Sequence, residues 1–189
     1  MAEDDVPSPM AIRFKLERLA RLMRQQGHGK GLVPVQWEAL RYLARANVLS
    51  NSPGALARYL GATKGTISQT LLSLEKKGLV EKSTRDGDAR SVALKLSDRG
   101  KALLAQDGLL IMERDIENLS DKTRKRMDRA LDELLRAVFL RLKEPSFGSC
   151  TTCRYFREGG SGASDQCMKV SAALTEEETK LICIEHVER

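Results

Sequence analysis

Apolar residues recur at steps of three and four along most of the first 143 residues, a spacing typical of amphipathic helices. It predicts a helix over residues 10–26. A second helix begins near Pro34, a residue tolerated in a first helical turn, and carries Trp37, Leu40 and Leu43 on one stripe. The chain is therefore expected to be largely helical.

Two short helices joined by a tight turn come next. Ser52 followed by Pro53 is a cap and first-turn signal, and Thr63 can cap the following helix. Gly78 stands where that helix should stop. The residues expected to face inward are Ile67, Leu71 and Leu74. This arrangement predicts a helix-turn-helix.

A β-hairpin and two long helices follow in the prediction. Two β-prone runs flank the turn-forming residues Asp86 and Gly87. Ser97 can cap a helix over 98–119, and Ser120 can cap another reaching residue 143. The stripe of the last helix consists of Met127, Leu131, Leu134, Val138 and Leu142. Together with the stripe of the first helix it predicts a dimer interface, the alternative being an intramolecular core.

Composition narrows the class of protein. The 189 residues are 41% apolar and 31% charged, as in a folded protein, and the apolar runs are too short and too interrupted to span a membrane. The N-terminus lacks the pattern of a secretory signal, so a cytoplasmic location is expected. The net charge of +6 belongs to residues 1–149 and hints at a polyanionic partner. No catalytic triad, phosphate loop or nucleotide fingerprint is present, so an enzyme is not expected.

Two stretches carry a family resemblance. Residues 62–82 (ATKGTISQTLLSLEKKGLVEK) are similar to the recognition helix of the MarR family of bacterial transcription regulators, and residues 86–100 (DGDARSVALKLSDRG) are similar to its wing. The family string D-x-R-x-x-x-V-x-L-[ST]-x-x-G is met by Asp88, Arg90, Leu96, Ser97 and Gly100, with Leu94 where the family favours valine. Residues 10–143 thus resemble the MarR family, with a DNA-binding core over about 34–100.

The resemblance implies a fold and a partner. The fold is mainly α with a small β-wing: a winged helix-turn-helix plus a helical dimerisation region. A homodimer would bind a palindromic operator in double-stranded DNA. The residues implied to meet the major groove are Lys64, Gly65, Thr66, Ser68, Gln69, Thr70 and Ser73. Arg90 would enter the minor groove, and Asp88 would hold the wing by pairing with Arg85.

All four cysteines lie in the last forty residues, as Cys150, Cys153, Cys167 and Cys183. Residues 144–149 are expected to be a linker and 150–189 a small metal-binding tail. Thr175 and Glu178 fit a capping box, which predicts a short helix that carries Cys183 and His186 one turn apart. In a reducing compartment, clustered cysteines indicate a metal centre more than disulfides, although a redox disulfide stays possible.

Two kinds of metal centre fit the spacing C-x2-C-x13-C-x15-C. It resembles that of high-potential iron-sulfur proteins, which implies a [4Fe-4S] cluster, with Tyr155 and Phe156 shielding it from water; four thiolates also suit a [2Fe-2S] cluster. A zinc site would take two close ligand pairs, with His186 as an alternative ligand to Cys167. Otherwise His186 is a surface residue at a helix end.

The expected function is a DNA-binding transcription regulator, of the repressor kind, whose tail cluster senses redox state, oxygen or iron. Because the tail follows the last dimerisation helix, loss of the cluster is expected to alter packing there. The alternative is a MarR-like regulator with structural or sensory zinc and a separate small-molecule effector pocket. An electron-transfer protein is the third reading.

Overall fold

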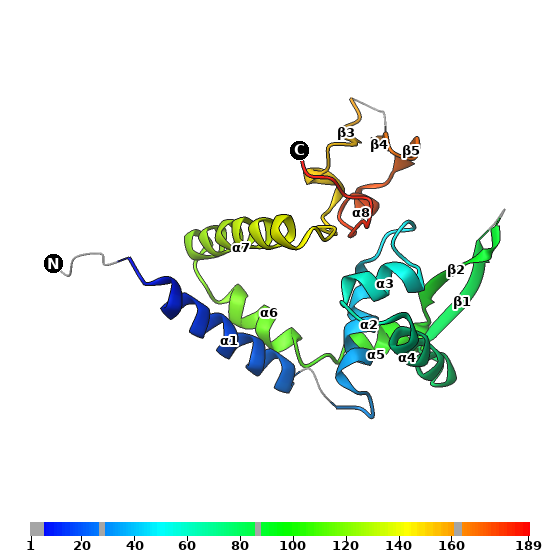
Figure 1. Ribbon diagram of the computed structural model, residues 1–189, viewed down its shortest axis with the longest axis horizontal. Coiled ribbons are helices and arrows are strands. Elements are labelled where there is room, and N and C mark those ends of the chain that lie inside the picture. The colour runs from blue at the N-terminus through cyan, green and yellow to red at the C-terminus, as the bar shows by residue number, and fades with distance from the viewer. Residues whose placement is uncertain (1–5, 27–28, 86–87, 161–163) are drawn as a thin grey trace.

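The computed structural model describes residues 6–26, 29–85, 88–160 and 164–189, apart from the side chains of residues 26, 85 and 88–91. In chain order its elements are α1 (Pro9–Gln26), α2 (Pro34–Arg45), α3 (Pro53–Tyr59), α4 (Lys64–Lys76), β1 (Val80–Arg85), β2 (Asp88–Leu96), α5 (Asp98–Leu104), α6 (Leu110–Glu117), α7 (Asp121–Leu142), a 3₁₀ turn η1 (Cys150–Thr152), β3 (Phe156–Arg157), β4 (Asp165–Cys167), β5 (Ala172–Leu174) and α8 (Glu176–Thr179). Figure 1 shows α2–α5 and the β1–β2 hairpin on one side, α1, α6 and α7 on the other, and the C-terminal segment above them. Among these described elements, no helix is both long and apolar enough to cross a membrane.

The core is formed by the helix-turn-helix and the strands behind it. Trp37 and Leu40 of α2 are buried against Leu56 of α3. The residues of α4 and β2 that complete this core are Ile67, Leu71, Leu74 and Leu94. Each fully buried leucine contributes about 1.5–3 kcal/mol, so this cluster supplies a large part of the stability. The predicted inward-facing residues of α4 are confirmed.

Side-chain caps begin the helices where the sequence predicts. The Ser52 hydroxyl accepts a hydrogen bond from the backbone N–H of Ala55, and the Thr63 hydroxyl from that of Thr66. Gly78 has φ +67°, a conformation that glycine adopts without strain, and α4 ends just before it.

The hairpin is antiparallel, with Val80 opposite Leu96. The predicted turn residues Asp86 and Gly87 lie outside the described residues. Gly100 explains part of the family string, because a Cβ there would lie 2.2 Å from the carbonyl oxygen of Leu79. Only glycine allows α5 to approach the start of β1 this closely.

The predicted helix over 98–119 is wrong: α5 ends at Leu104 and α6 begins at Leu110. Asp107 is the cause of the break. Its carboxylate accepts hydrogen bonds from Arg41 Nε (2.5 Å) and Nη2 (2.7 Å), and its Oδ1 also accepts one from the N–H of Leu109 (3.0 Å). An aspartate that binds the backbone two residues ahead favours a turn over a helix.

In the described residues of α1, α6 and α7, no side chain is fully buried. Apolar residues of the predicted stripes are exposed, namely Ile12, Leu19, Met23, Leu131, Leu134 and Leu142. Exposed apolar surface on this scale is typical of a face that another chain covers. One chain alone therefore leaves the predicted dimer interface open.

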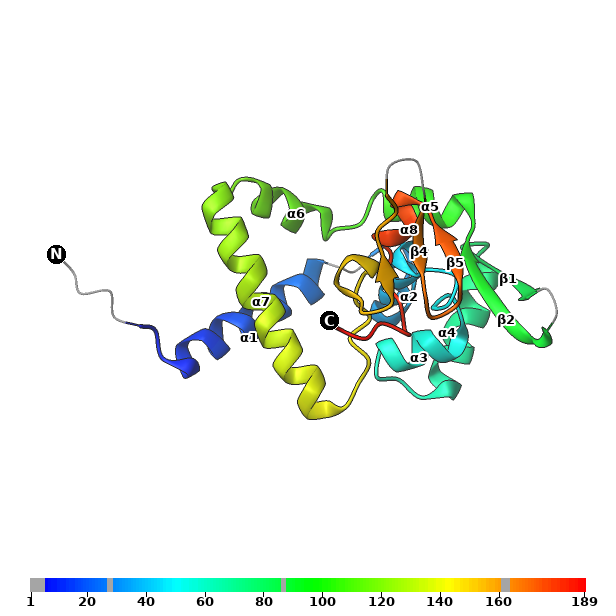
Figure 2. The ribbon, with the colours of Figure 1, turned by 90° about the horizontal axis from the view of Figure 1, so that it is seen from above.

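The C-terminal segment packs on the winged helix-turn-helix (Figure 2). Residues 144–149 form neither helix nor strand, but Phe147 within them is buried against the rings of Tyr42 and Tyr59, at centroid distances of 6.1 and 5.1 Å. Beyond them, β3, β4 and β5 form an antiparallel sheet.

The helix predicted to carry Cys183 and His186 is too long by two turns. The Thr175–Glu178 capping box is confirmed, yet α8 ends at Thr179. The backbone N–H groups that would continue the helix donate elsewhere: Ile182 to the carbonyl of Arg45 (2.8 Å) and Ile184 to the Ser50 hydroxyl (2.8 Å). Docking onto the loop between α2 and α3 thus replaces helical hydrogen bonds.

Candidate functional sites

One face of α4 is open to a ligand. Lys64, Gly65, Thr66, Ser68 and Gln69 are exposed, while the opposite face of the helix packs in the core. These side chains combine a cation with small donors and acceptors, the groups that bind phosphates and base edges.

Two predicted members of this face are placed differently. Thr70 is buried, and its hydroxyl donates to the carbonyl of Thr66 (2.9 Å). Ser73 is half-buried, and its hydroxyl accepts a hydrogen bond from Gln36 of α2 (2.9 Å). Both hydroxyls thus serve internal hydrogen bonds.

The wing residues named from the sequence have described backbones only. Arg85 ends β1, while Asp88 and Arg90 lie in β2, and their side chains fall outside the described part. Their predicted roles at the wing therefore stay predictions.

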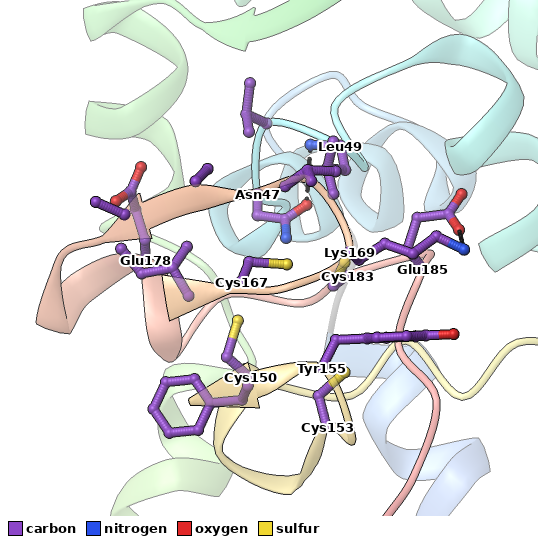
Figure 3. Close-up of a pocket in the computed structure, with 16 residues that line it drawn as sticks. Asn47, Leu49, Cys150, Cys153, Tyr155, Cys167, Lys169, Glu178, Cys183 and Glu185 are labelled. Atoms are coloured by element: carbon purple, nitrogen blue, oxygen red, sulfur yellow. Dashed lines mark hydrogen bonds and ion pairs between the residues drawn. The ribbon is translucent and has the colours of Figure 1, made fainter. Parts of the chain in front are cut away.

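The four cysteines, far apart in sequence, line one cavity of about 80 Å³ (Figure 3). Cys150 begins η1, Cys153 follows it, Cys167 ends β4 and Cys183 follows α8. Cys167 is partly exposed and the other three are buried; all four are free thiols.

The walls of this cysteine pocket are mainly apolar. Phe156 and Leu174 pack beside Cys150 and Cys153, as the prediction of aromatic shielding requires. Asn47, Val48 and Leu49, from the loop between α2 and α3, complete the lining. At the edge, Lys169 forms an ion pair with Glu185 (3.3 Å) and lies 5.4 Å from the centre of the Tyr155 ring.

Burial disfavours negative charge in the pocket. It raises the pKa of the Cys150 thiol to about 11, and the neighbouring cysteines add to this rise. Burial also raises the pKa of Cys183, against hydrogen bonds from the Asn47 side chain and the backbone of Glu185. A cationic group bound among these sulfurs would stabilise their thiolates.

Among the described residues, no set of three or more His, Cys, Asp or Glu side chains is arranged to hold a metal ion. His186 does not line the cysteine pocket. It is buried, contrary to the surface reading, and its Nδ1 and Nε2 lie 2.5 Å from the Ser146 hydroxyl and 3.0 Å from the Thr152 hydroxyl. With both ring nitrogens in hydrogen bonds, His186 is a structural residue of the tail.

A larger cavity of about 570 Å³ lies between the terminal helices and the winged helix-turn-helix. Arg24 of α1 and Arg41 and Arg45 of α2 line it, together with Met23 and Tyr59. Arginines beside apolar walls suit a small anionic or aromatic ligand.

These elements define a winged helix-turn-helix domain with an added cysteine-lined tail. The comparisons give the domain its family: residues 30–91 match the model of the MarR family. The chain is also similar to Staphylococcus aureus MepR in its DNA-binding conformation (22% identity, 67% of this chain and 98% of that one, TM-score 0.59) and in a DNA complex (21%, 66% and 96%, 0.53). A mutant of Escherichia coli MarR gives 21% identity over 70% of this chain and 99% of that one, with a TM-score of 0.51. At such identities the likeness establishes the fold. No curated protein sequence matches the chain.

Two important residues were missed in the sequence. Phe147, an aromatic in a predicted linker, was a signal that this segment packs against something. Asn47 gave no signal, because its contact with Cys183 joins residues that only the fold brings together.

Proposed function

We propose that the protein is a dimeric DNA-binding transcription regulator whose C-terminal cysteines hold an iron-sulfur cluster. The exposed polar face of α4 carries the first part of this proposal, and the shared lining of one cavity by four cysteines carries the second. No enzymatic role is proposed.

For DNA binding, the exposed residues of α4 are the groups that would enter the major groove, with Arg90 at the wing in the minor groove. MepR, which shares this fold, has been solved in a complex with DNA. Thr70 and Ser73 are left out of the proposed contacts because their hydroxyls bind within the domain.

Dimerisation supports the same role. A symmetric pair of chains would cover the exposed apolar residues of α1 and α7 and would present two copies of α4 to a palindromic operator.

Salt dependence tests the DNA contacts. Arg90→Ala should lower affinity and reduce the slope of log Kd against log salt by about 1, because one phosphate-neutralising charge is lost. Lys122→Ala, an exposed cation on α7, is the control and should leave the slope unchanged. Equal slopes for Arg90→Ala and the unmodified protein would refute the wing contact.

For the metal centre, the arrangement of the sulfurs favours a cluster. A single zinc ion needs its ligands to converge on one point, and no described set of side chains does so. An iron-sulfur cluster is larger and takes thiolates spread around its body, which suits four cysteines around one cavity. A [4Fe-4S] cluster is proposed first, with [2Fe-2S] as the other cluster type, and it would give the regulator a response to redox state, oxygen or iron.

Metal analysis after anaerobic purification tests the cluster. We expect iron and acid-labile sulfide, lost in Cys150→Ala. A colourless protein with one zinc per chain would contradict the cluster and favour the second candidate, a regulator with structural or sensory zinc. In that case the arginine-lined cavity is where a small effector would bind.

A further inference from the structure

The loop between α2 and α3, residues 46–52, joins the cysteine pocket to the winged helix-turn-helix. On the pocket side, the backbone N–H of Asn47 donates to the carbonyl of Ile182 (3.1 Å). The Ser50 hydroxyl accepts a hydrogen bond from the N–H of Ile184 (2.8 Å). These contacts hold the segment around Cys183 against the loop.

The other side of the loop is bound to the DNA-binding domain. The Tyr42 hydroxyl of α2 donates to the carbonyl of Ser50 (2.7 Å), and the N–H of Leu94 in β2 donates to the carbonyl of Asn51 (2.7 Å). Ser52 then caps α3. The loop therefore contacts α2, α3 and the wing strand β2 within six residues.

The side chain of Asn47 divides its two polar groups between these sides. Its Oδ1 accepts hydrogen bonds from the N–H groups of Leu49 and Ser50 (both 3.1 Å) and from the Ser50 hydroxyl (2.9 Å), which fixes the turn. The amide nitrogen, which only donates, remains for the sulfur of Cys183, to which the side chain is hydrogen-bonded. Figure 3 shows this amide directed into the pocket.

We propose that Asn47 is a positioning residue of the cysteine pocket, and that its amide transmits the state of the Cys183 sulfur to the winged helix-turn-helix. The inference rests on the proposed cluster. A thiolate bound to iron is a stronger acceptor for the Asn47 amide than a free thiol is, so loading strengthens one end of the loop. Hydrogen bonds to cluster sulfurs also tune the reduction potential.

Two variants separate the amide donor from the turn. Asn47→Asp keeps an acceptor oxygen for Leu49 and Ser50 but loses the N–H, while Asn47→Ser can still accept from the turn yet is too short to reach Cys183. Val48→Ala, an exposed neighbour in the same loop, is the matched control.

The experiment measures operator affinity of the cluster-loaded and cluster-free protein, together with the midpoint potential of the cluster. For the unmodified protein we expect loading to change affinity by about 5- to 150-fold, the usual range of allosteric coupling. Both Asn47 variants should bring this ratio to within about twofold of 1 and lower the potential, with the cluster-free affinity unchanged. Val48→Ala should keep the ratio.

Each contrary result has a distinct meaning. If the unmodified protein binds no iron and sulfide, the proposed cluster and this inference both fail. If it loads normally but the variants keep its ratio and potential, only the role of Asn47 fails. A cluster-free affinity that falls as far as the loaded one would show that Asn47 merely shapes the loop, and would overturn the coupling as well.

Discussion

Truncating Phe147 to alanine tests whether the C-terminal segment and the winged helix-turn-helix fold as one unit. The ring of Phe147 is only 6% exposed and meets Tyr42 and Tyr59 edge-on, with interplanar angles of 77° and 85°. Removing a buried phenylalanine costs about 3–5 kcal/mol in lost burial and an unfilled cavity. Phe147 has φ +49°, and alanine keeps that strain, so the change in stability reports packing.

Urea unfolding followed by the fluorescence of Trp37 is the suitable assay. Trp37 is the sole tryptophan of the chain and lies in the core of the DNA-binding domain, so it reports that domain directly. If both parts unfold together, Phe147→Ala should lower the free energy of unfolding seen by Trp37 by about 3–5 kcal/mol at fixed protein concentration.

The control is Met168→Ala, an exposed tail residue, which should change this free energy by less than about 0.5 kcal/mol. An unchanged Trp37 transition in Phe147→Ala, with the tail lost separately, would refute the single folding unit. It would restore the picture of a tail attached by a linker.

Two further changes test the helix junctions by urea unfolding. Gly100→Ala places a Cβ against the Leu79 carbonyl and should cost about 1–3 kcal/mol through forced backbone movement; an unaltered midpoint would contradict this close approach. Asp107→Asn leaves Arg41 without its carboxylate and should cost about 1–3 kcal/mol at neutral pH. Burial alone would raise the pKa of Asp107, but hydrogen bonds from Arg41 and the backbone of Leu109 outweigh it and hold this pKa below 3.8. The stabilisation is therefore complete above that pH and is lost as the pH falls through the lowered value, a loss that Asp107→Asn should not show.

The sequence predicted the parts of the fold that local patterns determine. Caps at Ser52 and Thr63 and the inward stripe of α4 follow from residues within one turn of each other, and all are confirmed. The errors lie where a distant partner decides. Asp107 breaks a predicted helix by binding Arg41, and docking of Ile182 onto Arg45 shortens α8.

The site divides in the same way. The spacing of the cysteines was enough to predict that they act together, since they line one cavity. It could not reveal Asn47, because the hydrogen bond to Cys183 depends on the tail folding back over α2 and α3. Nor could it show that Thr70 is buried, since a threonine on a helix fits either face.

The position of the tail also changes how a signal would reach DNA. The expectation from sequence was an effect through α7, and one contact of that kind exists, an ion pair between Arg136 and Glu188. Its side chains are largely exposed, and such pairs contribute about 0–1 kcal/mol. The contacts of the tail with α2 and its following loop are buried at Phe147 and Ile182 and hydrogen-bonded at Ser50. A coupling of 1–3 kcal/mol, typical of allostery, is therefore better supplied through the loop of Asn47 than through α7.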